Sequence, residues 1–197
     1  KRFIESFEKL GLKWNLIISC PCNPLPLKAF FEADFDEWEK SVHLNVIEQL
    51  RLLHKLYLFK NKERIPTVVF FSGAGTNSAV INFSAYAASK IMLIKMCELL
   101  DAENKDIKFS IIGPGWVKTK THNKIMDSLD KNNPKYIETY AFMNSDKGTS
   151  MEDIFRCIRW LEGQDKEMVG GRNFAVINDK WKGDGELVGV GDTEGVD

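Results

Sequence analysis

Tyr86 and Lys90 are the residues whose types and spacing point most directly to chemistry, because they stand four positions apart. On a helix, this spacing places both side chains one turn apart on the same face. A phenol titrates near about pH 10, and an ammonium a few ångströms away stabilises the phenolate and lowers the phenol pKa. The pair could therefore act as a general acid and base. The alternative is a chance pairing on a solvated helix face, because short motifs recur by accident.

Ser72 is a second candidate, because it follows the apolar run of residues 66–71 and precedes Gly73 and Gly75. Its hydroxyl could donate a hydrogen bond to a substrate oxygen, and the two glycines let the backbone approach a ligand closely. The alternative interpretation is that Ser72 caps a turn.

A polar amide and a third loop complete the set of candidates. Asn45 lies beside the apolar stripe of an expected helix over residues 35–59, where a buried amide needs a hydrogen-bond partner. The loop at residues 113–119 follows another run of strand type, 107–112. If both runs are parallel strands, Ser72 and this loop open on the same edge of one sheet.

The elements that would position these groups alternate between helices and apolar strands. We expect helices over residues 3–10, 35–59, 84–101 and 151–161 and strands over 14–20, 66–71, 107–112 and 174–177. Gly11 ends the first helix, and Asp34 is the expected N-cap of the second. This order predicts an α/β fold with a doubly wound, Rossmann-like parallel sheet, in which ligands bind beyond the carboxyl ends of the strands. Residues 116–149 lack a strong period and are expected to form a long loop with short helices that contacts substrate.

Composition narrows the class of protein. The 197 residues carry 27 basic and 28 acidic side chains, so neither nucleic acid nor an anionic membrane is an expected partner. No apolar run approaches the roughly 20 residues of a membrane span, and we expect an intracellular, cytoplasmic protein. The four cysteines and three histidines have no disulfide or metal spacing, so no metal is expected. One domain over residues 1–179 and a mobile acidic, Gly-rich tail over residues 180–197 are expected.

Taken together, these motifs resemble the short-chain dehydrogenase/reductase family over residues 3–120. The matching residues are Asn45, Ser72, Tyr86, Lys90 and the segment from Pro114 to Thr119.

The resemblance implies an NAD- or NADP-dependent oxidoreductase that interconverts an alcohol and a carbonyl on a small molecule. Tyr86 would transfer the proton, Ser72 would position the substrate oxygen, and Lys90 would lower the Tyr86 pKa and hold the nicotinamide ribose. Asn45 would hold a water that links Lys90 to solvent. The loop after the third strand would bind the nicotinamide through Pro114, Gly115, Val117 and Thr119.

Three departures from the family pattern matter. Residues 19–22 read Ser-Cys-Pro-Cys where the family has an Asn-Asn-Ala-Gly-like segment, so that end of the sheet is expected to be held differently. Ser72 is one residue farther from Tyr86 than is usual, which indicates a slightly longer loop; Ser78 is the alternative to Ser72. The family's first strand and Gly-rich turn are absent, so the sequence is expected to be N-terminally incomplete, lacking the first strands. A scaffold or interaction protein that lacks cofactor is the alternative function.

Association and substrate complete the expectations. Helices 35–59 and 84–101 carry more apolar residues than one buried face uses, which favours a homodimer or homotetramer; packing on the sheet is the alternative. The apolar residues in question are Leu52, Leu56, Ile91, Leu93, Ile94 and Met96. Residues 82–86 and 170–174 look similar to those of family members that act on sugar nucleotides in bacterial surface-polysaccharide pathways.

Overall fold

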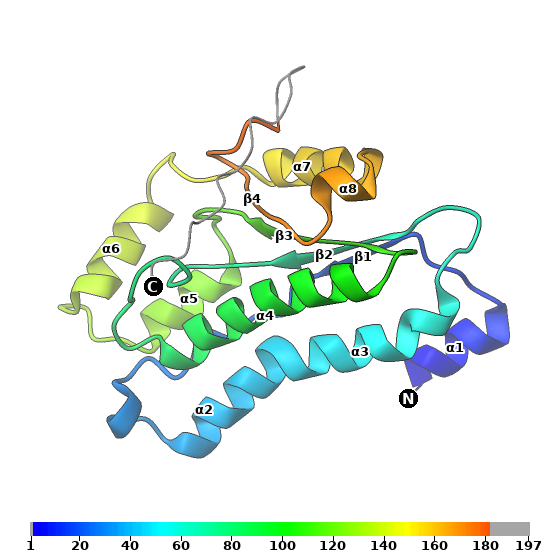
Figure 1. Ribbon diagram of the computed structural model, residues 1–197. Coiled ribbons are helices and arrows are strands. Elements are labelled where there is room, and N and C mark those ends of the chain that lie inside the picture. The colour runs from blue at the N-terminus through cyan, green and yellow to red at the C-terminus, as the bar shows by residue number, and fades with distance from the viewer. Residues whose placement is uncertain (1, 182–197) are drawn as a thin grey trace, which may run out of the picture.

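A four-stranded parallel sheet forms the centre of the molecule in the computed structural model, which describes residues 2–181 (Figure 1). The strands are β1 (Leu16–Ser19), β2 (Thr67–Phe71), β3 (Lys108–Gly113) and β4 (Asn173–Ala175). Their order in the sheet is β1-β2-β3-β4, and every neighbouring pair is parallel. The predicted α/β fold and all four predicted strands are confirmed, with ends that differ by a few residues.

Helices connect the strands and cover both faces of the sheet (Figure 1). The α-helices are α1 (Arg2–Leu10), α2 (Phe35–Val42), α3 (Glu48–Leu56), α4 (Ser84–Glu103), α5 (Lys120–Asp127), α6 (Pro134–Met143), α7 (Met151–Gly163) and α8 (Lys166–Val169). A π-helical turn, η2 (His43–Ile47), joins α2 to α3, and short 3₁₀ turns η1 (Phe30–Glu32) and η3 (Tyr57–Phe59) flank this rod. The expected helix over residues 35–59 is therefore confirmed, with Asn45 at the centre of its π turn.

Two local signals in the sequence act as predicted at the helix ends. The Asp34 side chain accepts a hydrogen bond from the Glu37 backbone N–H at 3.1 Å, which caps α2. Gly11 ends α1 in the left-handed region, with φ of 61°, where a glycine is least strained.

Alternating residues of the strands feed two separate cores, because successive side chains point to opposite faces of a sheet. Val68 and Phe70 pack with side chains of η2, α3 and α4 on one face. Val69 and Ile112 pack with side chains of α7 and α8 on the other. Burial on both faces explains why β2 is continuously apolar from Val68 to Phe71.

The segment at residues 116–149 contains α5 and α6, which lie beyond the carboxyl ends of the strands (Figure 1). The expected long loop with short helices is confirmed. Its Ile125 packs with Leu27 and Phe83 in a third apolar cluster, so α5 is held against the entry to α4. These contacts hold α5 beyond the carboxyl ends of the strands.

The structure corrects two expectations about exposure. Trp181, which we expected in the tail, is 5% exposed, and its Nε1–H donates to the Val176 carbonyl at 2.9 Å, so the folded part continues at least to residue 181. The rest of the predicted tail, residues 182–197, lies outside the described residues. Leu56 and Leu93, which we considered for an interface, belong to the core, whereas Leu52 and Ile91 are exposed. Within residues 2–181, no helix has the length and apolar character that a membrane span requires.

Candidate active site

A cavity of about 1540 Å³ opens at the carboxyl edge of the sheet. Its walls come from the end of β1, the loop after β2, the start of α4, the loop after β3 and the turn after β4. Ser72, Tyr86 and Lys90 all line it. The structure therefore brings three of the four predicted catalytic residues to one cavity, as expected for a parallel sheet whose loops share an edge.

Tyr86 lies directly against the loop that carries Ser72. A Cβ atom built on Gly73 would stand 2.1 Å from the Tyr86 hydroxyl oxygen, so only glycine leaves room for the phenol there. Ser72 precedes this glycine, is 6% exposed, and its hydroxyl donates to the Asn173 side-chain oxygen at 3.3 Å. Ser72 and Tyr86 therefore lie beside one another on the cavity wall. The glycine after Ser72 thus allows the close approach of the Tyr86 side chain.

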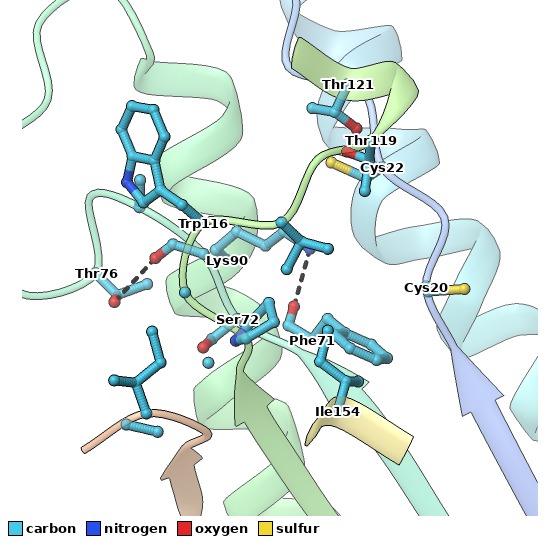
Figure 2. Close-up of a pocket in the computed structure, with 18 of the residues that line it drawn as sticks. Cys20, Cys22, Phe71, Ser72, Thr76, Lys90, Trp116, Thr119, Thr121 and Ile154 are labelled. Atoms are coloured by element: carbon cyan, nitrogen blue, oxygen red, sulfur yellow. Dashed lines mark hydrogen bonds between the residues drawn. The ribbon is translucent and has the colours of Figure 1, made fainter. Parts of the chain in front are cut away.

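Lys90 is buried, and its ammonium donates to the Phe71 carbonyl at 2.9 Å, at the carboxyl end of β2 (Figure 2). Its Nζ atom lies 5.6 Å from the centroid of the Tyr86 ring. The predicted i, i+4 neighbourhood of the two side chains on α4 is thus present. An ammonium has three N–H donors, so the bond to Phe71 leaves donors for a ribose hydroxyl.

The pKa of Tyr86 moves in the direction opposite to the sequence-based expectation. Burial raises the pKa of the phenol above its ordinary value of 10.0, and the neighbouring Cys22 thiol raises it further. Burial also lowers the pKa of Lys90, while Cys22 and Cys20 act to raise it. Desolvation, which the sequence does not reveal, is the largest cause of this shift. Tyr86 therefore carries its proton at neutral pH.

Asn45 is fully buried and holds the segment that follows β1. Its Oδ1 accepts from the Asn23 backbone N–H at 2.7 Å, and its Nδ2 donates to the Asn23 carbonyl at 2.8 Å. Nδ2 also lies 3.3 Å from the Ser41 hydroxyl. We expected the segment after β1 to be held differently from the family pattern. In the structure, the Asn45 side-chain amide holds it by pairing with both backbone groups of Asn23. Asn45 does not line the cavity, and its role in a water relay stays a prediction.

The loop after β3 brings all of its predicted cofactor-binding residues, Pro114, Gly115, Val117 and Thr119, to the cavity wall. Gly115 has φ of 72°, and a Cβ there would meet Thr149 and Ile177, each at 2.8 Å. The substitute for Ser72, Ser78, does not line the cavity.

The Gly-Gly pair near residue 170 has a structural explanation. A Cβ on Gly170 would stand 2.3 Å from an Asp101 carboxylate oxygen, and the Gly171 N–H donates to the Phe109 carbonyl at 2.8 Å. The glycines thus let the chain pass close to α4 and β3 on its way into β4.

Several residues of the cavity were missed by reasoning from sequence. Cys20 and Cys22 line it from the segment after β1, where we noted them only as a departure (Figure 2). His122, Lys135 and Thr139 line it from α5 and α6. Their segment has no strong period, and a lysine or threonine there carries no motif. The only available signal was their position after a strand end.

The nicotinamide half of a dinucleotide fits the donors of this cavity. Lys90 can bond to ribose hydroxyls, and Thr119 offers a hydroxyl for a carboxamide. Gly113, Gly115 and Gly73 line the same wall and let the backbone approach closely. The chemistry of these groups is compatible with a bound nicotinamide nucleoside.

Comparison with known proteins places the chain in a family. The sequence profile of the short chain dehydrogenases matches residues 21–130, more than half of the 197 residues. Among curated proteins, none matches. Many solved structures share the fold.

Three of these structures illustrate the likeness. A short chain dehydrogenase/reductase from Saccharomyces cerevisiae is 19% identical, with a TM-score of 0.77 over 91% of this chain and 72% of that one. A short chain dehydrogenase from Shigella flexneri in complex with NADP is 19% identical, with a TM-score of 0.72 over 89% and 68%. The aldohexose dehydrogenase of Thermoplasma acidophilum is 13% identical, with a TM-score of 0.75 over 89% and 71%. At these identities the likeness establishes the fold.

Proposed function

The chain belongs to the short chain dehydrogenase family of oxidoreductases, and we propose on that premise that it carries the catalytic groups of an NAD- or NADP-dependent enzyme. The proposed reaction interconverts a carbonyl and an alcohol on a small molecule, with Tyr86 as the general acid and base. The observation that carries this proposal is the contact between the Tyr86 hydroxyl and Gly73, next to Ser72 on the wall of the large cavity.

In the reducing direction, the substrate carbonyl oxygen would accept hydrogen bonds from the hydroxyls of Ser72 and Tyr86. A bound NADH or NADPH supplies the hydride that adds to the carbonyl carbon. The Tyr86 proton then moves to the oxygen, which gives the neutral alcohol. Because its pKa is raised, Tyr86 is a proton donor at rest, and the phenolate that remains is stabilised by the nearby Lys90 ammonium.

The cofactor would lie with its nicotinamide along the loop after β3. We assign its ribose hydroxyls to Lys90 and its carboxamide to Val117 and Thr119, with Pro114 and Gly115 shaping the wall. The NADP complex of the Shigella flexneri relative supports the choice of a nicotinamide dinucleotide. The exposed Leu52 and Ile91 on α3 and α4 support the proposal of a homodimer or homotetramer.

The direct test replaces Tyr86 by Phe in the protein. The cofactor-dependent absorbance change with a carbonyl substrate should fall at least about 100-fold, the contribution of a positioned proton donor. NADH or NADPH should bind the variant as it binds the parent, because the ring remains. Tyr140→Phe is the matched control, since Tyr140 is 55% exposed and does not line the cavity.

Full activity of the Tyr86→Phe variant would exclude the acid–base role. If neither NADH nor NADPH binds the parent protein in calorimetry, the alternative of a scaffold protein with this fold replaces the enzyme proposal.

A further inference from the structure

A second polar cluster lines the cavity on the side of α5 and α6, away from the strand ends. It consists of His122, Lys135 and Thr139, with the Trp116 ring beside them. Figure 2 shows Trp116 on the loop that leads from β3 to α5, with its ring directed away from Ser72 and Lys90. The reaction described above uses none of these groups.

Lys135 is the charged member of the cluster. Its Nζ atom lies 4.9 Å from the Trp116 ring centroid and 5.9 Å from that of Phe83, so two aromatic rings hold the ammonium in place. Its side chain is 29% exposed, and it pairs at 2.8 Å with Glu138, whose side chain is 55% exposed. Because an ammonium has three donors, this ion pair leaves donors for a ligand.

Thr139 and His122 add two unpartnered polar atoms. Thr139 is fully buried, and its Oγ1 has no hydrogen-bond partner within residues 2–181. The buried Nδ1 atom of His122 likewise has none in this described part of the chain. A buried polar group without a partner is costly, so a ligand that supplies hydrogen bonds here would be favoured.

Phe83 links this cluster to the Tyr86 ring. Its centroid lies 6.3 Å from that of Tyr86 and 5.9 Å from the Lys135 ammonium, so these two groups are at most about 12 Å apart. One small molecule can therefore place its carbonyl at Tyr86 and a second polar group at Lys135, with its apolar middle against Phe83 and Trp116.

The charges on the cavity wall are mostly positive. Lys90, Lys135 and Arg172 line it, whereas Asp179 is the carboxylate found among its described lining residues. The Asp179 carboxylate accepts a hydrogen bond from the Ala175 N–H at 2.6 Å. In a chain of net charge -1, this excess of cations favours an anionic ligand.

We propose that Lys135, Thr139 and His122 form a subsite for an anionic group, a carboxylate or a phosphate, on the substrate whose carbonyl reaches Tyr86. The assignment rests on the proposed function and adds the substrate class to it. Lys135 binds the anion, Thr139 donates its hydroxyl hydrogen to it, and the aromatic walls select a flat or short connecting group.

The test compares the reduction of three matched aldehydes by this protein: 4-formylbenzoate, its methyl ester, and 4-formylphenyl phosphate. An anion that bonds to Lys135 should give the acid or the phosphate a kcat/KM about tenfold to 100-fold above that of the ester. Lys135→Gln should remove this preference, so that the acid and the phosphate are reduced with the kcat/KM of the ester in the same variant. Lys124→Gln, an exposed lysine of α5 that does not line the cavity, is the matched control.

The anionic aldehyde with the higher kcat/KM identifies whether the subsite prefers a carboxylate or a phosphate. Equal kcat/KM for all three aldehydes, or a preference that survives in Lys135→Gln, would overturn the subsite while the enzyme proposal stands. If no aldehyde is reduced, calorimetry with terephthalate and phenyl phosphate decides: binding that Lys135→Gln weakens about tenfold supports the subsite. Absence of such binding overturns it.

Discussion

The contact between Gly73 and Tyr86 allows the proposed acid to be displaced without altering its chemistry. In Gly73→Ala, the new Cβ would stand 2.1 Å from the phenolic oxygen, whereas ordinary contacts to a Cβ begin at 3.4 Å. The oxygen must therefore withdraw by about 1.3 Å. A misplacement of about 1 Å in a reacting group costs about 100-fold in rate, so we expect kcat to fall by about that factor.

Gly163→Ala is the control for this experiment, because a Cβ at Gly163, the last residue of α7, meets nothing within 4 Å. Steady-state kcat should separate the two variants. A near-ultraviolet circular dichroism spectrum establishes that each variant is folded. A folded Gly73→Ala protein with the kcat of the parent would refute either the placement of Tyr86 or its part in the reaction.

Two other predictions concern the protonation of Tyr86 and the hydrogen bonds between Asn45 and Asn23. Since the Tyr86 pKa is raised, the phenol stays protonated over the neutral range, so kcat for reduction should stay level from about pH 6 to about pH 8. Oxidation needs the phenolate instead, so kcat for oxidation should rise over the same range. A reduction rate that falls with a midpoint near about pH 7 would contradict the raised pKa. Asn45→Leu leaves the Asn23 N–H and carbonyl without their partner, and urea unfolding should show a loss of about 1–3 kcal/mol. Asn123→Leu, at an exposed position of α5, should change stability much less, and an equal loss in both variants would remove the special role of Asn45.

The elements of this fold could be predicted because each follows from local pattern. The apolar runs that became β2 and β3 are buried on both faces, and Asp34 caps its helix through a contact three residues away. The neighbourhood of Tyr86 and Lys90 follows from their spacing of four residues on one helix.

What could not be predicted depends on contacts between distant segments. The bonds of Asn45 join residues 22 positions apart, and a side-chain amide does not reveal which backbone it will meet. The direction of the Tyr86 pKa shift depends on burial and on Cys22, which approaches from the segment after β1. Trp181 follows a polar stretch that is typical of a tail, yet its side chain belongs to the core cluster that contains the buried face of α7.

The order of the sheet, β1-β2-β3-β4, means that each strand pairs with the strand before it in the chain. During synthesis on the ribosome, the edge that accepts the next strand is thus already present when that strand emerges. No strand within residues 2–181 has to be inserted between two that are already paired. Tyr86 and Lys90 emerge before α5 and α6, so the groups for proton transfer are made before those that would select the substrate.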